Sequence, residues 1–140
     1  NGQIKSQSIV YTENYVENEQ NRIRYLYDGL GKYYDEKGNL AGEMVLDKNK
    51  TYGNEMKLYF PNGNVQYYAI MGDSVKEYID KIIEYYDNGQ IKQDCTETSG
   101  SWSCLTYSKD GTYKGRAQGK PKTYSNLWVN IGLAFLNVLF

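Results

Sequence analysis

Tyr85-Tyr86-Asp87-Asn88-Gly89-Gln90-Ile91-Lys92 is the stretch that decides the fold, because its pattern returns along the chain. An aromatic pair is followed by a turn that ends in Gly, and an apolar residue stands two places after that Gly. Repetition of this pattern is typical of an array of β-hairpins. The other copies are Leu58-Tyr59-Phe60-Pro61-Asn62-Gly63-Asn64-Val65, Tyr33-Tyr34-Asp35-Glu36-Lys37-Gly38-Asn39-Leu40 and Thr106-Tyr107-Ser108-Lys109-Asp110-Gly111-Thr112-Tyr113.

The turns of the four copies predict which residues face each other. Asn88-Gly89 and Asn62-Gly63 are typical of two-residue turns in which both positions take φ > 0. The other two copies are one residue longer, and a three-residue loop with Gly at the left-handed position restores the pairing. The predicted opposing pairs are Tyr86 with Ile91, Phe60 with Val65, Tyr34 with Leu40, and Tyr107 with Tyr113.

The N-terminal part carries less regular copies. The chain opens on the second half of a copy, residues 1–5, and a degraded copy is expected from Tyr15 to Arg24, with Asn21 in place of the Gly and Ile23 as its apolar residue. Strand-like runs at 8–11 and 22–27 are followed by a closing turn at 28–31. The start in mid-motif without Met fits either a removed signal peptide or a shortened chain.

Composition limits the class of protein. A chain of 140 residues fits a single domain or one short repeat array. With 16 residues, Tyr suits a thin, half-solvated sheet, because its ring packs while its hydroxyl reaches water. The net charge of -1 gives no electrostatic footprint for nucleic acid.

Two readings fit residues 73–84. A helix is indicated by Ser74 and Glu77, which form a capping box, and by apolar residues at helical spacing. A strand is indicated by alternation from Val75 to Ile79 and by the need to enter the next hairpin in extended form. The second argument favours the strand.

The two cysteines are placed for a cross-strand disulfide. If Ser99-Gly100 is a two-residue turn, residues whose numbers add up to 199 face each other, and Cys95 and Cys104 meet that condition. The alternative is a pair of reduced, buried thiols. A disulfide favours an extracytoplasmic location, secreted, periplasmic or at the cell surface, over a cytoplasmic one.

The C-terminal end differs from the repeats. Residues 109–122 are basic, and residues 127–140 are almost continuously apolar but too short to span a bilayer. A short helix is expected there, either as a cap on the sheet or as a segment that docks on a membrane surface or partner. The docking candidates are Lys120, Lys122, Trp128 and Phe135.

Enzymatic patterns are weak. The chain has no His, so His-based catalysis and His metal sites are excluded, and no phosphate-binding glycine loop is present. The carboxylates sit at turns, where Asp serves the backbone. We therefore expect neither an enzyme nor a cofactor or metal site.

The fold expected is all-β, with repeated antiparallel hairpins forming one elongated, meandering sheet over residues 1–116 and a linker with an apolar capping or docking segment over 117–140. The cores 59–65 and 85–92 resemble the variant MORN repeat of bacterial proteins labelled YwqK-family antitoxins. This resemblance implies a non-enzymatic array that binds proteins or membranes, with toxin neutralisation as one form of binding.

Two functional hypotheses follow. In the first, one sheet face packs Tyr34, Phe60, Tyr86 and Tyr107, and the other displays a recognition surface for a protein partner. The candidates on that surface are Tyr33, Tyr59, Tyr85 and Lys92, with Gln66 in register. The alternative for this tyrosine row is cross-strand packing alone. In the second hypothesis, the C-terminal candidates bind a membrane surface.

Overall fold

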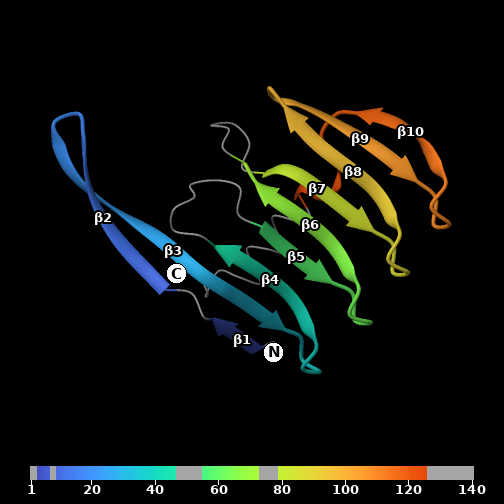
Figure 1. Cartoon of the computed structure of the whole chain (residues 1–140), viewed down its shortest axis with the longest axis horizontal. Helices are drawn as coiled ribbons and strands as arrows, with labels where there is room; N and C mark the ends of the chain where they lie inside the picture. The colour runs from blue at the N-terminus through green and yellow to red at the C-terminus, as the bar shows by residue number, and fades with distance from the viewer. Residues whose placement is uncertain (1–2, 7–8, 47–54, 73–78, 126–140) are drawn as a thin grey trace.

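The computed structural model describes residues 3–6, 9–46, 55–72 and 79–125 (Figure 1). These residues form ten strands, all in one antiparallel sheet. The strands are β1 (Gln3–Ser6), β2 (Ile9–Glu17), β3 (Gln20–Tyr34), β4 (Leu40–Leu46), β5 (Glu55–Tyr59), β6 (Val65–Met71), β7 (Ile79–Tyr85), β8 (Ile91–Thr98), β9 (Ser101–Tyr107) and β10 (Tyr113–Gln118).

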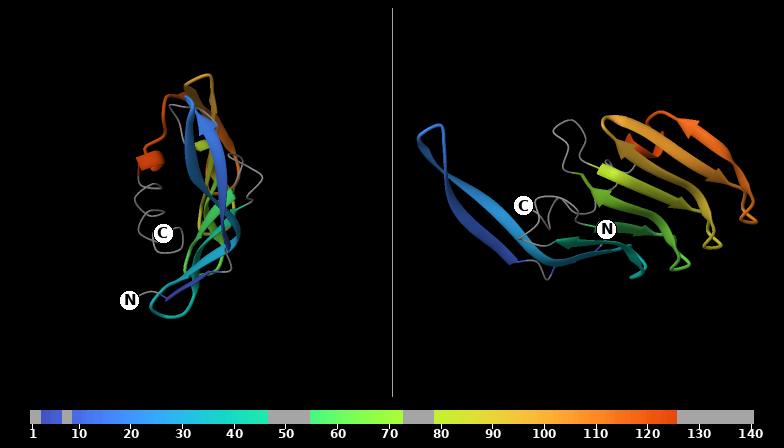
Figure 2. Two further views of the ribbon diagram at one scale, coloured as in Figure 1. Left: turned by 90° about the vertical axis from the view of Figure 1, so that its left-hand side faces the viewer. Right: turned by 45° about the horizontal axis from the view of Figure 1, so that its top comes forward.

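From β3 to β10 each strand pairs with the next one in the chain, which confirms the predicted meander (Figure 1). The N-terminal strands depart from this order. The second half of β3 lies between β1 and β4, whereas its first half pairs with β2 alone. The β2–β3 hairpin therefore projects from the end of the sheet as a two-stranded ribbon (Figures 1 and 2).

All four glycine turns have the same geometry, so the prediction of two turn lengths is wrong. In the hairpin β7–β8, Gly89 N donates to Tyr86 O over 3.0 Å, and Tyr86 N donates to Gln90 O over 2.8 Å. The same two bonds close the turns at 35–39, 60–64 and 108–112. Each loop therefore holds three residues, and its Gly alone takes a positive φ, as at Gly89 with +89°.

This uniform loop shifts the pair beside the turn of each shorter copy by one residue, and a bulge restores the predicted register farther along the strands. Tyr85, not Tyr86, lies opposite Ile91, and Tyr59, not Phe60, lies opposite Val65. The pairs predicted for the longer copies, Tyr34 with Leu40 and Tyr107 with Tyr113, are confirmed. Because side chains alternate along a strand, Tyr59 and Tyr85, and not their neighbours Phe60 and Tyr86, share one face with Tyr34 and Tyr107.

The N-terminal turns also differ from prediction. The β2–β3 turn is formed by Asn18 and Glu19, which take φ values of +50° and +63°, so Asn21 is not a turn residue but pairs with Val16. The expected turn at 28–31 is absent, because these residues continue β3. Two glycines within 28–31 suggest a turn, but here both pair with β4 instead.

The structure separates the two readings for residues 73–84 only in part. Ile79–Tyr85 is a strand, as favoured, and residues 73–78 lie outside the described part. At the C-terminal end, residues 123–125 are helical, while the helix expected over 127–140 also lies outside the described residues.

One face of the sheet carries the core and is called here the core face. Its buried residues are Met44, Met56, Leu58, Ala69, Ile79, Ile82, Cys95, Trp102 and Cys104. Tyr124 packs against them from beyond β10, with its ring centroid 5.9 Å from that of Trp102 in an edge-to-face arrangement. Figure 2 (left) shows the end of the described chain on one side of the sheet.

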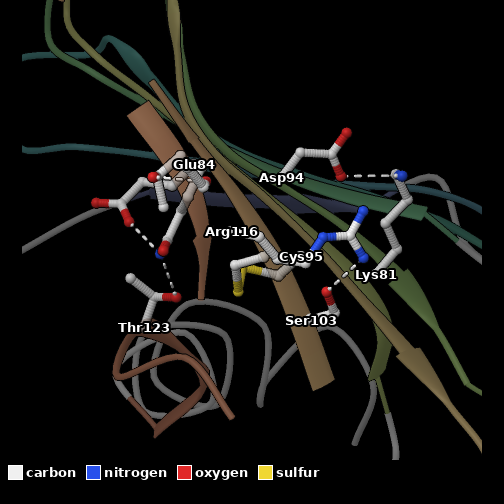
Figure 3. Close-up of a disulfide and its surroundings, with 11 residues drawn as sticks. Lys81, Glu84, Asp94, Cys95, Ser103, Arg116 and Thr123 are labelled. Atoms are coloured by element: carbon white, nitrogen blue, oxygen red, sulfur yellow. Dashed lines mark hydrogen bonds and ion pairs between the residues drawn. A yellow bond between two sulfur atoms is a disulfide. The ribbon is translucent and has the colours of Figure 1, made fainter. Parts of the chain in front are cut away.

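The predicted disulfide joins Cys95 and Cys104 on the core face, with 4.0 Å between the two Cα atoms (Figure 3). Ser99 and Gly100 both take positive φ and form the two-residue turn that sets this register. Beside the disulfide, Gln93 Nε2 donates to Glu84 Oε2 over 2.8 Å and to Thr123 Oγ1 over 3.3 Å. These bonds tie the segment after β10 to the core face.

Candidate functional site

The face opposite the core, called here the open face, carries a row of aromatic and aliphatic residues next to the turns. Each of the four glycine turns contributes one opposing pair, because Tyr stands four residues before the Gly and an apolar residue stands two after it. We call this row the aromatic band. Its members are Tyr34, Leu40, Tyr59, Val65, Tyr85, Ile91, Tyr107 and Tyr113.

The band has members on eight strands, β3 to β10, and remains partly accessible. Its residues are half-buried except Tyr113, which is 55% exposed. At the end of the band, the ring centroids of Tyr107 and Tyr113 lie 5.6 Å apart with their planes at 61°. Such edge-to-face pairs fix the rings of opposing residues. The repeat thus builds a surface of apolar rings that is only partly covered.

Two tyrosines of the open face donate hydrogen bonds to carboxylates on a neighbouring strand. Tyr59 Oη donates to Glu43, and Tyr68 Oη donates to Glu55 Oε1 over 2.6 Å. Burial first, and then the bond and charge of Glu55, raise the pKa of Tyr68 to about 12. Burial first, and then the bond and charge of Glu43, raise the pKa of Tyr59. Both rings are therefore held by their hydroxyl ends and stay neutral.

An ion pair lies beside the next tyrosine of the band. Lys81 Nζ lies 3.0 Å from Asp94 Oδ1, and Figure 3 shows both residues on the side of the sheet away from the disulfide. Burial and the charge of Asp94 raise the pKa of Tyr85, while Lys81 lowers it. Three carboxylates of the open face are thus each engaged by a hydroxyl or an ammonium group.

The structure divides the predicted partner-binding residues between both faces. Tyr59 and Tyr85 lie together on the open face, whereas Tyr33 packs against the core cluster. Lys92 Nζ lies 3.4 Å from Glu84 Oε1, and Lys92 lines a hollow of about 320 Å³ together with Tyr85 and Gln66, as predicted. The predicted placement of Tyr33 with Tyr59 and Tyr85 is wrong.

The sequence did not single out Tyr68, nor the two glutamates that accept hydrogen bonds from tyrosines of the open face, Glu43 and Glu55. A register shift lies between Leu58 and Tyr59, so the extra residue, Gln66, changes the alternation of β6. Tyr68, three residues after Val65, therefore joins it on the open face. The available signal was the distance from each Tyr to its Gly, which is four residues in every copy.

The C-terminal candidates are described only in part. Lys120 Nζ lies 4.2 Å from the ring centroid of Tyr124 and makes a cation–π contact with this ring, which packs against the core. Lys122 is exposed. Trp128 and Phe135 lie outside the described residues, and no helix of the described part is long and apolar enough to cross a membrane.

Within the described ranges, no group of three or more Cys, Asp or Glu side chains is placed to hold a metal ion. Glu84, the buried carboxylate of the core face, accepts a hydrogen bond from Gln93 and forms an ion pair with Lys92. Burial raises the pKa of Tyr67, and the charge of Glu84 raises it further. The described carboxylates bond neighbouring side chains, as Glu84 does, or backbone N–H groups of the turns, as Asp110 does with Thr112 N.

Comparison with known families finds the MORN repeat variant at three places, residues 27–47, 52–70 and 81–96. These segments coincide with the hairpins β3–β4, β5–β6 and β7–β8. The fourth hairpin, β9–β10, lies outside them but has the same turn bonds. No curated protein and no solved structure matches the chain. The chain therefore carries three MORN repeat variants within a single antiparallel sheet.

Proposed function

We propose that this chain is a non-enzymatic repeat protein that binds a protein partner through its open face. The observation that carries the proposal is the aromatic band, a row of half-buried rings and aliphatic side chains across eight strands. Apolar surface of this extent on one side of a sheet is typical of a recognition site. The opposite face is already occupied by the core.

The band has the chemistry of a binding surface. Tyrosine supplies a large contact area while losing little conformational entropy on binding. Tyr59 and Tyr68 are further restrained by their bonds to Glu43 and Glu55. Residues that are fixed before the partner arrives lower the entropic cost of association.

The sequence and the disulfide each favour a class of partner. The sequence resembles antitoxin-like repeat proteins, so a toxin neutralised by direct contact is the partner class we propose to examine first. The disulfide fits an extracytoplasmic protein, for which a surface or secreted protein is the corresponding partner. The membrane hypothesis has less support, because Lys120 is engaged by Tyr124 and the apolar candidates lie outside the described residues.

Affinity capture with the full chain, followed by purification of the recovered protein, provides the ligand for a direct test. Replacing Tyr59 and Tyr85 by Ser is expected to weaken its binding at least 30-fold, since even one central aromatic residue contributes about 2 kcal/mol at interfaces. Tyr15→Ser, on the projecting hairpin, is the matched control and is expected to bind as the native chain does. Equal binding by the double variant, shown to be folded by its unfolding transition, would contradict the proposal.

A further inference from the structure

The β2–β3 ribbon exposes a strand edge that the described part of the chain leaves unpaired. β2 has one neighbour, β3, and the nine pairs between them run from Ile9–Asp28 to Glu17–Gln20 without a register shift. A two-stranded ribbon is at best marginally stable by itself in water. Pairing with another strand would add backbone hydrogen bonds along its whole length.

The other end of the sheet shows how an edge is protected. β10 is six residues long, contains Lys114 and Arg116, and is interrupted by a register shift next to Gly115, whose φ is +146°. Short strands, bulges and basic residues are the features by which proteins prevent edge-to-edge pairing. β2 is longer, is regular, and has no Lys, Arg, Pro or Gly.

We propose that β2 pairs antiparallel with β2 of a second copy of this chain, about a two-fold axis. The two ribbons then form one four-stranded sheet in the order β3, β2, β2 and β3. An isologous contact of this kind closes on itself, so it gives a dimer and not a fibre. The second copy suits the edge because a two-fold pairing supplies a strand of the same length and regularity.

Charge decides the register of this pairing. A two-fold axis through Glu13 would place two carboxylates opposite each other, which is destabilising. An axis through Asn14 instead places Tyr11 opposite Glu17, and Glu13 opposite Tyr15. Tyrosine and glutamate on adjacent strands also meet within the sheet, where Tyr59 and Tyr68 donate to glutamates placed diagonally to them on neighbouring strands.

Exposure supports the same register. Val16 is 71% exposed, the highest value among the exposed large hydrophobic residues of the described chain. With the axis at Asn14, Val16 lies opposite Thr12 of the second copy and is covered. With the axis at Thr12, Val16 would lie beyond the paired residues. One added strand pair buries little surface, so we expect a reversible dimer.

Disulfide trapping tests the register. The native cysteines are already bonded to each other and are buried, so an added cysteine is the only free thiol. Asn14→Cys is expected to form covalent dimers on mild oxidation, while Glu36→Cys, equally exposed at a turn of the array, is expected to remain monomeric. Equal rates of crosslinking for the two variants would overturn the proposal.

Sedimentation equilibrium tests the pairing without a crosslink. Val16→Lys places a charge on the edge strand and is expected to shift the monomer–dimer equilibrium at least tenfold toward monomer. Val45→Lys is the control, since Val45 is 49% exposed and pairs with Leu30 of β3, beyond the residues that pair with β2. A native chain that stays monomeric at every concentration, or equal dimerisation by both variants, would refute the dimer while leaving partner binding by the open face untouched.

Discussion

Asn88 Nδ2 donates a hydrogen bond to the backbone carbonyl oxygen of Lys109 over 3.0 Å, so one turn of the array is bonded to the next. Asn62 makes the same bond to Asp87 O over 2.8 Å. Each Asn also caps its own turn, since Asn88 Oδ1 accepts from Gln90 N over 3.0 Å. The Asn before the Gly therefore serves two turns at once, which explains its place in the motif.

Replacing Asn88 by Ala removes both bonds, and we expect the free energy of unfolding to fall by about 1 kcal/mol, as for exposed hydrogen bonds. Asn88→Asp keeps the acceptor for Gln90 N but loses the donor to Lys109 O. In urea unfolding at high salt, which screens the new charge, the Asp variant should also be less stable than the native chain. A native value for Asn88→Asp would show that the bond between turns does not stabilise the array.

The turn glycines are predicted to matter through their backbone alone. Gly63 has φ +90°, and a Cβ built there meets nothing within 4 Å. Gly63→Ala should therefore cost about 1–2 kcal/mol of backbone strain, and Gly63→Asn less, because Asn tolerates a positive φ better. Thermal or urea unfolding of the two variants checks this order. A cost for Gly63→Asn that equals or exceeds that of Gly63→Ala would contradict a purely backbone origin.

The hairpin array and its disulfide could be predicted from the sequence because both depend on local spacing. The Cys95–Cys104 pairing follows from one turn, Ser99-Gly100. The pairing beside the turns of the shorter copies could not be obtained in this way. Asn-Gly by itself favours a two-residue turn, but the amide of Asn88 reaches Lys109, 21 residues away, and this contact appears only when the turns are stacked.

The disulfide is expected to contribute about 2–3 kcal/mol, the value for a short closed loop. Replacing both Cys95 and Cys104 by Ser should therefore lower the urea midpoint without changing the hairpin register, which the turn at Ser99-Gly100 sets independently. Adding a reductant to the native chain should reproduce the midpoint of the double variant. A native chain that is unaffected by complete reduction would contradict this.

Stability is predicted to fall at high pH through Tyr68. Its pKa is raised from the usual 10.0 to about 12, first by burial and then by Glu55. Because the folded value is above the unfolded one, the contribution is complete below pH 10 and is lost as the pH rises toward about 12. NMR titration of isotope-labelled tyrosine should show Glu55→Gln lowering this pKa. A titration of Tyr68 near 10 in the native chain would contradict the burial and bonding described.

The type of candidate site, a row of tyrosines on one face of the sheet, could be predicted from the sequence. Which residues form that row could be predicted only in part. Exposed tyrosines on one face were expected, and Tyr59 and Tyr85 lie there. Tyr33 does not, because the shorter copies also have three-residue loops, so that the Tyr four residues before each Gly faces the open side and Tyr33, five residues before Gly38, packs against the core. Face assignment requires the loop type of every copy, and an error of one residue reverses it.

The central claim is that the aromatic band is the surface that binds the partner. Hydroxyl-radical footprinting of the full chain, with and without the captured protein, reads the solvent exposure of each side chain directly. The account predicts reduced oxidation at Tyr59, Tyr85, Ile91 and Tyr107 in the complex, with no change at Tyr15. Unchanged oxidation across the band, with protection confined to the turns or to the β2–β3 ribbon, would contradict it.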